Sequence, residues 1–256
     1  MQVKKLCYNI IMKRFLITIQ YDGKNYFGFQ IQENEQKTIQ QVIEDTMNGL
    51  FNEKIEIFAS GRTDAGVSAL AQTAHFDSET TIPAEKIPFA LNERLPNDIK
   101  IIDCVEVDKD FHARFNVKKK TYVYSTYFSK HLLPLFDEKS FWLKKCPSVK
   151  LMKECAKILE GKHNFKGFMS SGGQAKTFER IIYYIDIQQK DNLITFEVCG
   201  NGFLYNMVRI IVGTLLEVGL KKKTIEDVKN ILSSGDRTKA GFLVPAKALM
   251  LKSVKY

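Results

Sequence analysis

Ala59-Ser-Gly-Arg-Thr-Asp-Ala-Gly-Val-Ser-Ala-Leu-Ala-Gln-Thr-Ala-His-Phe76 is the stretch of this chain that decides its fold. Its two ends belong to apolar runs, residues 55–59 and 72–76, whose composition is typical of strands. The segment between them is therefore expected to be a loop carried on the edge of a sheet.

That loop contains a short motif that places two charges close together. Gly61 and Gly66 bracket Arg62 and Asp64, and glycine permits backbone conformations forbidden to other residues as well as the close approach of a ligand. A tight turn in which Asp64 caps its own backbone is the commoner explanation for such a motif. A loop that presents a carboxylate and a guanidinium to a substrate is the functional alternative.

Apolar spacing predicts the elements on either side of the loop. Alternation with a period of two indicates half-buried strands, and apolar residues three and four positions apart indicate helices. The first half is expected to contain strand 14–21, helix 38–50, strands 55–59 and 72–76, helix 84–95 and strand 99–107. The second half is expected to contain strand 121–127, helix 148–159, strands 181–187 and 193–198, helices 202–220 and 224–232, and strand 248–254.

Both halves follow the order β-α-β-β-α-β, with one helix added in the second. A duplicated split-βαβ unit predicts an α+β protein with two ferredoxin-like subdomains, each an antiparallel sheet covered by helices on one face. If the two sheets meet edge to edge or face each other, their open faces form a central cleft. We place the boundary near residues 108–111, with subdomains at 12–109 and 110–256 and a poorly ordered extension at 1–11.

Several further blocks accompany the Arg62–Asp64 loop along the chain. They are Tyr21-Asp-Gly-Lys-Asn-Tyr-Phe-Gly-Phe-Gln-Ile-Gln32, Leu91-Asn-Glu-Arg-Leu-Pro-Asn-Asp-Ile99, Phe111-His-Ala-Arg-Phe115, Lys120-Thr-Tyr-Val-Tyr124 and Gly200-Asn-Gly-Phe-Leu-Tyr-Asn-Met-Val-Arg-Ile-Ile-Val-Gly213. In this order they resemble the blocks of the bacterial tRNA pseudouridine synthase family called TruA, over about residues 12–256. The resemblance implies the pseudouridine synthase fold and isomerisation of uridine in RNA.

The resemblance also implies roles for individual residues. Asp64 corresponds to the nucleophile, and a carboxylate in a mostly dry pocket needs a nearby cation to stay ionised. Arg209 is implied to be that cation, although an arginine on an apolar helix usually directs its guanidinium outward to solvent. Tyr122 is implied to stack on the target uracil and to help move a proton, whereas by itself it is an ordinary strand tyrosine. Arg62 is implied to enter the space that the flipped nucleotide leaves.

Other residues are candidates for binding the substrate. Leu249 is a weaker candidate for the apolar wall of the pocket. The basic run at 118–120 precedes the Tyr122 strand, and we favour phosphate contact over a solvated cluster. The RNA-binding set that we predict is Arg62, Tyr122, Leu249, Arg114, Lys118, Lys119, Lys120 and Gln30.

Composition limits the class of protein. The chain has 256 residues, a formal net charge of +9 and an isoelectric point near 9.1, which favours a polyanionic partner. Its five cysteines are scattered without a C-x-x-C pair, so we expect reduced thiols in a cytoplasmic protein.

No apolar run has the ~18 residues of a membrane span, so we expect no membrane association. The histidines lack metal-ligand spacing, so we expect neither a metal nor a cofactor. The resemblance implies a homodimer.

The match to the family weakens at positions around the site. Ser68 stands where the family has histidine, Phe29 where it has tryptophan, and Asn164 where it has aspartate. These changes spare the residues implied in catalysis and bear on substrate choice. The leading hypothesis is uridine at tRNA positions 38, 39 and 40 of the anticodon stem-loop, and the runner-up is a divergent paralogue acting on another RNA such as rRNA.

Two hypotheses from other classes remain. A catalytically silent RNA-binding protein would keep the fold and the RNA affinity without the reaction. A glycoside hydrolase is weaker, because the sequence places no second carboxylate near Asp64. The sequence does not identify the base that removes the C5 proton.

Overall fold

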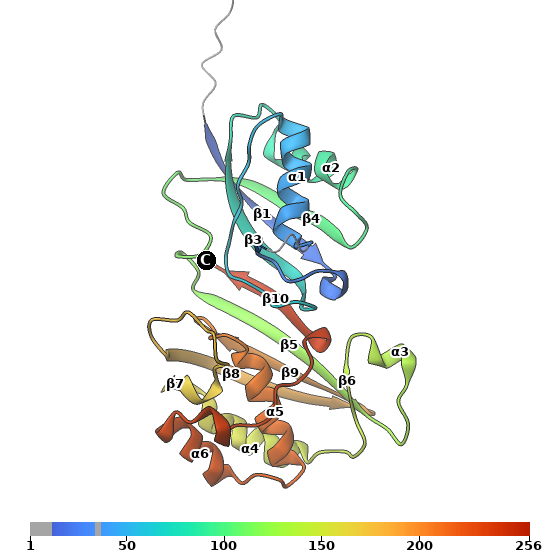
Figure 1. The fold of residues 1–256 in the computed structure, drawn as a ribbon, viewed down its shortest axis with the longest axis vertical. Coiled ribbons are helices and arrows are strands. Elements are labelled where there is room, and N and C mark those ends of the chain that lie inside the picture. Colours follow the sequence, from blue (N-terminus) through green and yellow to red (C-terminus); the bar gives the residue numbers. More distant parts are fainter. Residues whose placement is uncertain (1–11, 34–36) are drawn as a thin grey trace, which may run out of the picture.

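The computed structural model describes residues 12–33 and 37–256, so the expected extension at 1–11 lies outside the described residues. The chain forms a mixed sheet with helices packed against it (Figure 1). The strands are β1 (Lys13–Tyr21), β2 (Phe58–Ala59), β3 (Ser68–Ser78), β4 (Ile99–Val107), β5 (Lys119–Phe128), β6 (Phe141–Leu143), β7 (Gly161–Asn164), β8 (Glu179–Lys190), β9 (Leu193–Gly200) and β10 (Leu249–Lys255). The α-helices are α1 (Ile39–Phe51), α2 (Ile87–Asn92), α3 (Pro134–Asp137), α4 (Val149–Leu159), α5 (Met207–Gly219) and α6 (Ile225–Ser234).

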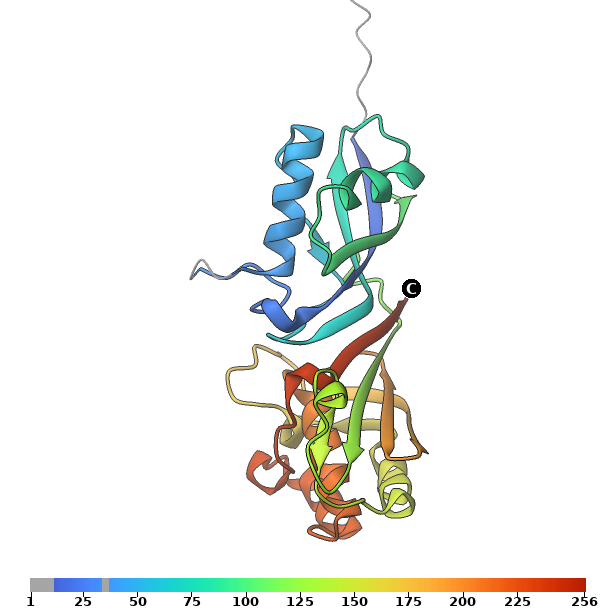
Figure 2. The same cartoon turned by 90° about the vertical axis from the view of Figure 1, so that its right-hand side faces the viewer.

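The strand order shows the internal repeat directly. The first half is ordered β4-β1-β3-β2 and the second, without the short additional strands β6 and β7, β10-β5-β9-β8. Each half therefore places its fourth main strand first, then its first, third and second. This is the order of a split-βαβ unit, and the predicted α+β fold with two such units is confirmed. The two sheets meet edge to edge, because β10 pairs in parallel with β3 and antiparallel with β5. Figure 2 shows β10 crossing between the halves.

Two strands, β2 and β10, pair with the same edge of β3 at different positions along it. β2 pairs with β3 at Ala74 and His75, and β10 pairs with it at Ser68 and Ala69. The loop from residue 60 to 67 connects β2 to β3 and therefore lies beside the point where β10 joins the halves.

The alternating pattern of β1 explains how the first core forms. Phe15, Ile17 and Ile19 are buried while their neighbours are more exposed, and they pack in one cluster with Ile43 and Met47 of α1. Thr38 begins α1 by accepting a hydrogen bond from the Gln41 amide, the expected N-terminal cap.

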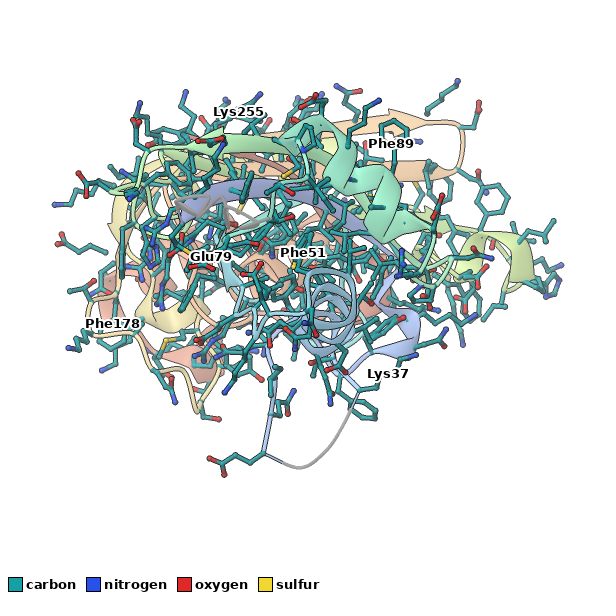
Figure 3. All side chains as sticks on the ribbon, turned by 90° about the horizontal axis from the view of Figure 1, so that it is seen from above. Lys37, Phe51, Glu79, Phe89, Phe178 and Lys255 are labelled. Carbon is teal, nitrogen blue, oxygen red and sulfur yellow. The ribbon has the colours of Figure 1, made fainter. Side chains whose placement is uncertain are left out.

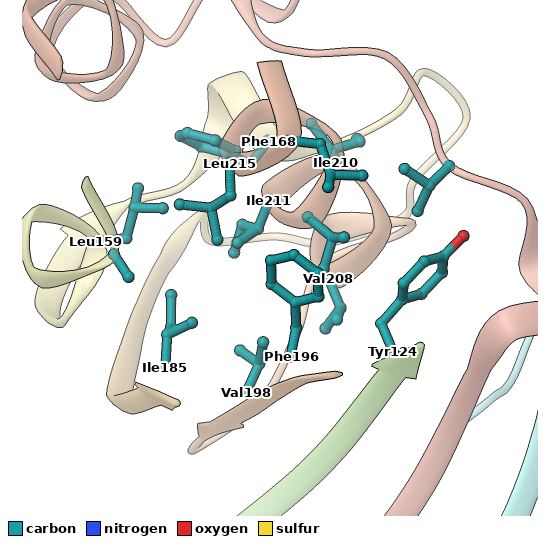
Figure 4. Close-up of a cluster of buried hydrophobic side chains, with 14 of the residues drawn as sticks. Tyr124, Leu159, Phe168, Ile185, Phe196, Val198, Val208, Ile210, Ile211 and Leu215 are labelled. Carbon is teal, nitrogen blue, oxygen red and sulfur yellow. The ribbon is translucent and has the colours of Figure 1, made fainter. Parts of the chain in front are cut away.

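The second core lies between α5 and the strands of its own half. Figure 4 shows Val208, Ile211 and Leu215 of this helix directed toward Phe196 and Val198 of β9. The residues of α5 are buried almost all round, which is typical of a central helix rather than a surface one.

Each core includes one residue from the other half. Leu251 of β10 packs in the first core, and Val67, at the end of the 60–67 loop, packs in the second. These exchanges hold the halves together through apolar contact. The boundary near residues 108–111, and with it the division into 12–109 and 110–256, stays a prediction.

Some elements differ from those predicted. Helix α5 begins at Met207 rather than 202, because Asn206 has a φ of 61° and turns the chain at that point. β2 has only 2 residues, and α3 and β7 are short elements that the apolar spacing did not predict.

The segment around α3 is tied to both halves by ion pairs. Glu138 pairs with Lys24 at 2.6 Å, Asp137 pairs with Lys247 at 2.6 Å, and Lys139 pairs with Asp22. Exposed pairs of this kind contribute little energy singly, but together they fix where the segment lies. Within the ranges that the structure describes, no helix is long and apolar enough to cross a membrane.

Candidate active site

The 60–67 loop is held at its base by side chains on both sides. The Ser60 hydroxyl donates to Oε1 of Gln72 at 2.7 Å, and Nε2 of Gln72 donates to the Gly61 carbonyl at 2.8 Å. Both polar side chains are buried. Because buried polar groups bond specifically where partners are in place, these contacts fix the direction in which the loop leaves β2.

The middle of the loop is fixed by the Tyr21–Phe29 segment. The hydroxyl groups of Tyr21 and Thr63 lie 2.7 Å apart, and the Phe29 amide donates to the Thr63 carbonyl at 3.1 Å. Gly28, with a φ of 92°, approaches so closely that a Cβ there would lie 2.8 Å from the Thr63 carbonyl oxygen. Thr63, the residue before Asp64, is therefore held in place by contacts from residues outside the loop.

Asp64 contacts the second half of the chain through Arg209. Its Oδ2 lies 3.5 Å from Nη1 of Arg209, with side-chain exposures of 29% for Asp64 and 13% for Arg209. Burial raises the pKa of the Asp64 carboxyl above its ordinary value, and the Arg209 guanidinium opposes this rise. The carboxylate is thus partly desolvated and is stabilised by a cation from the other repeat.

Arg209 is held in the first turn of α5 by two further acceptors. Nη1 donates to Oδ1 of Asn206 at 2.8 Å, and Nε donates to the Val244 carbonyl at 2.8 Å. Hydrogen bonds from a charged donor are the stronger ones. They aim the guanidinium at Asp64 instead of solvent, in contrast to the usual behaviour of an arginine on an apolar helix.

Tyr122 lies on β5 at the boundary of the two cores and packs against both. Its ring meets Phe203 edge-on, with centroids 5.2 Å apart. Burial raises the pKa of its hydroxyl, and the Asp64 carboxylate raises it further. Leu251 of β10 lies opposite both Tyr122 and Ala69 of β3, so Tyr122 lies near the strand that follows the Asp64 loop. Together these contacts bring Asp64, Tyr122 and Arg209 to one place from β3's loop, β5 and α5.

The remaining predicted residues differ in their exposure to solvent. Arg62 is exposed on the loop next to Asp64, and Leu249 is buried opposite Tyr124 in the pairing of β10 with β5. Arg114, Lys118 and Gln30 are exposed. Tyr124 fills the core and donates to the Pro245 carbonyl at 2.9 Å.

The two lysines that begin β5 point to different faces of the sheet. Lys119 pairs with Lys255 of β10, and Figure 3 shows Lys255 on the side of the sheet opposite Lys37 and Phe178. Side chains alternate along a strand, so Lys119 lies on the face opposite Tyr122. Its ammonium lies 5.2 Å from the centroid of the Tyr183 ring. Lys120 lies on the Tyr122 face and is partly buried.

Several residues that shape the site were missed by the sequence analysis. Tyr21, Thr63 and Gln72 position the loop, and Asn206 positions Arg209. All four stand inside the quoted stretches of sequence, which is the available signal. In the portion of the chain that the structure describes, no group of three or more histidine, cysteine, aspartate or glutamate residues is arranged to hold a metal ion.

Several known proteins are similar to this chain over nearly its whole length. The tRNA pseudouridine synthase family model matches residues 17–116 and 155–256. The protein named tRNA pseudouridine synthase A from Ruminiclostridium cellulolyticum is 42% identical over 96% of this chain and 100% of that protein. The protein named tRNA pseudouridine synthase A 2 from Clostridium tetani is 44% identical over 94% of this chain and 97% of that protein.

Solved structures give a weaker likeness. The crystal structure of the archaeal box H/ACA sRNP Nop10-Cbf5 complex aligns with 91% of this chain and 58% of that chain, at 12% identity and a TM-score of 0.37. Such a low score adds nothing to the assignment, which rests on the family model and on the near full-length relatives. By both of these criteria, the chain belongs to the tRNA pseudouridine synthase family.

Proposed function

We propose that this chain isomerises uridine to pseudouridine in tRNA, with Asp64 as the nucleophile. The observation that carries the proposal is the ion pair of 3.5 Å between Asp64 and Arg209, formed across the two repeats beside Tyr122. The curated relatives bear the name tRNA pseudouridine synthase A, and the family membership supports the same reaction for this chain.

The reaction breaks the N1–C1′ bond of uridine, turns the uracil, and forms a C5–C1′ bond. The C5 proton leaves to a base and N1 gains a proton, so no oxidant, reductant or external energy source is needed. A carboxylate suits this chemistry because it can form a covalent bond to the substrate and leave again. Arg209 keeps Asp64 ionised in a partly desolvated position, against the rise in its pKa that burial causes.

The neighbouring side chains have complementary roles in this proposal. The Tyr122 ring provides a plane for the detached uracil, since stacking on an aromatic side chain contributes about 1–3 kcal/mol per base. Arg62 is exposed two residues before Asp64, where it can occupy the space of a nucleotide flipped out of its stack. Leu249 is buried and supplies apolar surface near this position.

We further propose that the target is uridine at positions 38, 39 and 40 of the anticodon stem-loop and that the enzyme acts as a cytoplasmic homodimer. The family membership and the formal net charge of +9 support an RNA substrate. The free cysteines at 104, 146, 155 and 199 are compatible with a reducing compartment.

Release of tritium from tRNA labelled at C5 of uracil tests the proposal. The purified protein should release tritium to water, and Asp64→Asn should release none while remaining folded and binding tRNA. Release from rRNA but not from tRNA would identify a paralogue of different specificity. Binding of RNA without release from either substrate would contradict the proposed reaction and favour a silent RNA-binding protein.

A further inference from the structure

Lys120 occupies an unusual place for a residue of a basic surface run. Its side chain extends from β5 to the base of the 60–67 loop, where Nζ donates to the Ser60 carbonyl at 2.6 Å. The acceptor belongs to the first repeat and the donor to the second. The contact therefore ties the loop that carries Asp64 to the strand that carries Tyr122.

Gly61 makes the space through which this ammonium reaches its acceptor. A Cβ at position 61 would lie 2.4 Å from Nζ of Lys120, closer than any real contact. Only glycine leaves room for the ammonium at this point. The lysine and the glycine, distant in sequence, fit together as one arrangement.

The same two loop residues are also bonded from the β3 side. Gln72 accepts from the Ser60 hydroxyl and donates to the Gly61 carbonyl. Residues 60 and 61 are thus held by side chains of both repeats, whereas Arg62 immediately after them is exposed. Thr63 is held in turn by Tyr21 and Phe29, so the exposed Arg62 lies between two fixed backbone positions.

We propose that Lys120 is a positioning residue, which sets the loop carrying Asp64 against Tyr122 and Arg209 by bonding the Ser60 carbonyl through the gap at Gly61. The inference rests on the proposed function for its catalytic consequence. It replaces the phosphate contact predicted for this lysine from the sequence, because the ammonium is partly buried and is directed at a backbone carbonyl.

The charge state of Lys120 is compatible with this role. Burial, together with the nearby Arg114 guanidinium, lowers the pKa of Lys120 to about 8. The amine is therefore still mostly protonated at pH 7 and has N–H groups to donate. Arg114 itself is exposed and remains available to an RNA phosphate.

Two variants remove the contact from opposite sides. Lys120→Met deletes the ammonium and keeps a flexible apolar side chain that is only one atom shorter. Gly61→Ala displaces only the flexible end of Lys120, so it is expected to fold even where Lys120→Met does not. Lys255→Met, an exposed lysine on the other face of the sheet, is the matched control and should behave as the wild type.

Steady-state tritium release separates positioning from binding. Because misplacement of a reacting group by about 1 Å can cost about 100-fold in rate, we expect kcat to fall about 10- to 100-fold in both variants, with KM for tRNA changed less than about threefold. The double variant should be no slower than the slower single variant, since both changes remove one contact. Hydrogen exchange of the amides at 60–67 should accelerate in both variants and not in Lys255→Met.

The opposite results would overturn the inference. A rise in KM with unchanged kcat, and a salt dependence of tRNA binding reduced by about one phosphate contact, would identify Lys120 as an RNA ligand. Unchanged kcat in Gly61→Ala would contradict the positioning role. If the wild type forms no pseudouridine, the proposed function fails, and the exchange of the loop amides alone decides the inference.

Discussion

Replacement of Arg209 by methionine tests the central contact of the site. Methionine keeps much of the aliphatic length and removes the guanidinium that lies 3.5 Å from the Asp64 carboxylate. It also deletes the donors to Asn206 and to the Val244 carbonyl. Asp64 would then be partly buried without a cation, a condition that disfavours the ionised form.

The size of the effect follows from the distance and the exposure. Two unit charges 3.5 Å apart interact by about 5 kcal/mol at an effective dielectric constant of about 20. Solvent reaches 29% of Asp64 and 13% of Arg209, so we retain roughly half of this energy, about 2–3 kcal/mol. Since about 1.4 kcal/mol corresponds to a tenfold change, we expect kcat at pH 7 to fall about 30- to 150-fold.

The dependence on pH identifies the cause of that loss. Burial raises the pKa of Asp64 and Arg209 lowers it, so removing Arg209 moves the acid limb of the rate profile to higher pH. Tritium release by Arg209→Met should therefore increase with pH over a range in which the wild type has already reached its plateau. Lys252→Met, which breaks an exposed ion pair with Glu197, should leave the profile unchanged.

The reasoning would be refuted by either of two results with a folded variant. One is a kcat for Arg209→Met within about threefold of the wild type at pH 7. The other is an acid limb at the wild-type position despite a large loss of rate, because Arg209 would then act without affecting the ionisation of Asp64. Circular dichroism and the melting temperature establish that the variant is folded.

Four other predictions test the surroundings of the site. Tyr122→Ala should weaken tRNA binding by about 1–3 kcal/mol in a filter assay, whereas Tyr122→Phe should bind like the wild type; equal losses would exclude stacking. Leu251→Ala should lower the free energy of unfolding by about 2–5 kcal/mol in denaturant, since Leu251 is buried in the first core. Gly213→Ala should lower the melting temperature although alanine favours a helix by up to ~1 kcal/mol, because its Cβ would lie 1.9 Å from the Phe242 carbonyl oxygen; a higher melting temperature would contradict the close contact. Burial and the charge of Arg14 lower the pKa of His75 from 6.5 to about 4. The unfolded state therefore binds a proton at a higher pH than the folded state, and the free energy of unfolding should decrease as the pH falls from about 6.5 to about 4. This decrease should be smaller in His75→Gln.

Most of the fold could be predicted from local patterns. The alternation of Phe15, Ile17 and Ile19 and the helical spacing after Thr38 are local signals, and the structure confirms a strand and a capped helix there. The junction between the halves could not be predicted in this way. Parallel pairing of Met250 with Ser68 depends on contacts between segments far apart in the sequence, which no short window contains.

The site shows the same limit more sharply. Arg209 has the local sequence of a buried helix, and its orientation depends on Asn206 and the distant Val244 carbonyl. The lysines at 118–120 were predicted as one phosphate-binding run, yet Lys119 and Lys120 lie on opposite faces of β5. Alternation along a strand could have separated them. The gap at Gly61 that admits Lys120 could be found only in the folded structure.

The position of β10 explains why the site forms where it does. Leu251 is opposite Ala69 of β3 on one side and opposite Tyr122 of β5 on the other. This register sets Tyr122 beside the loop that precedes β3, and so beside Asp64. A shift of β10 by one residue would turn Leu251 out of the first core and misplace Tyr122 relative to the loop. Because β10 pairs with a strand of each half, the burial of Leu251 in the first core stabilises the fold and the geometry of the site at once.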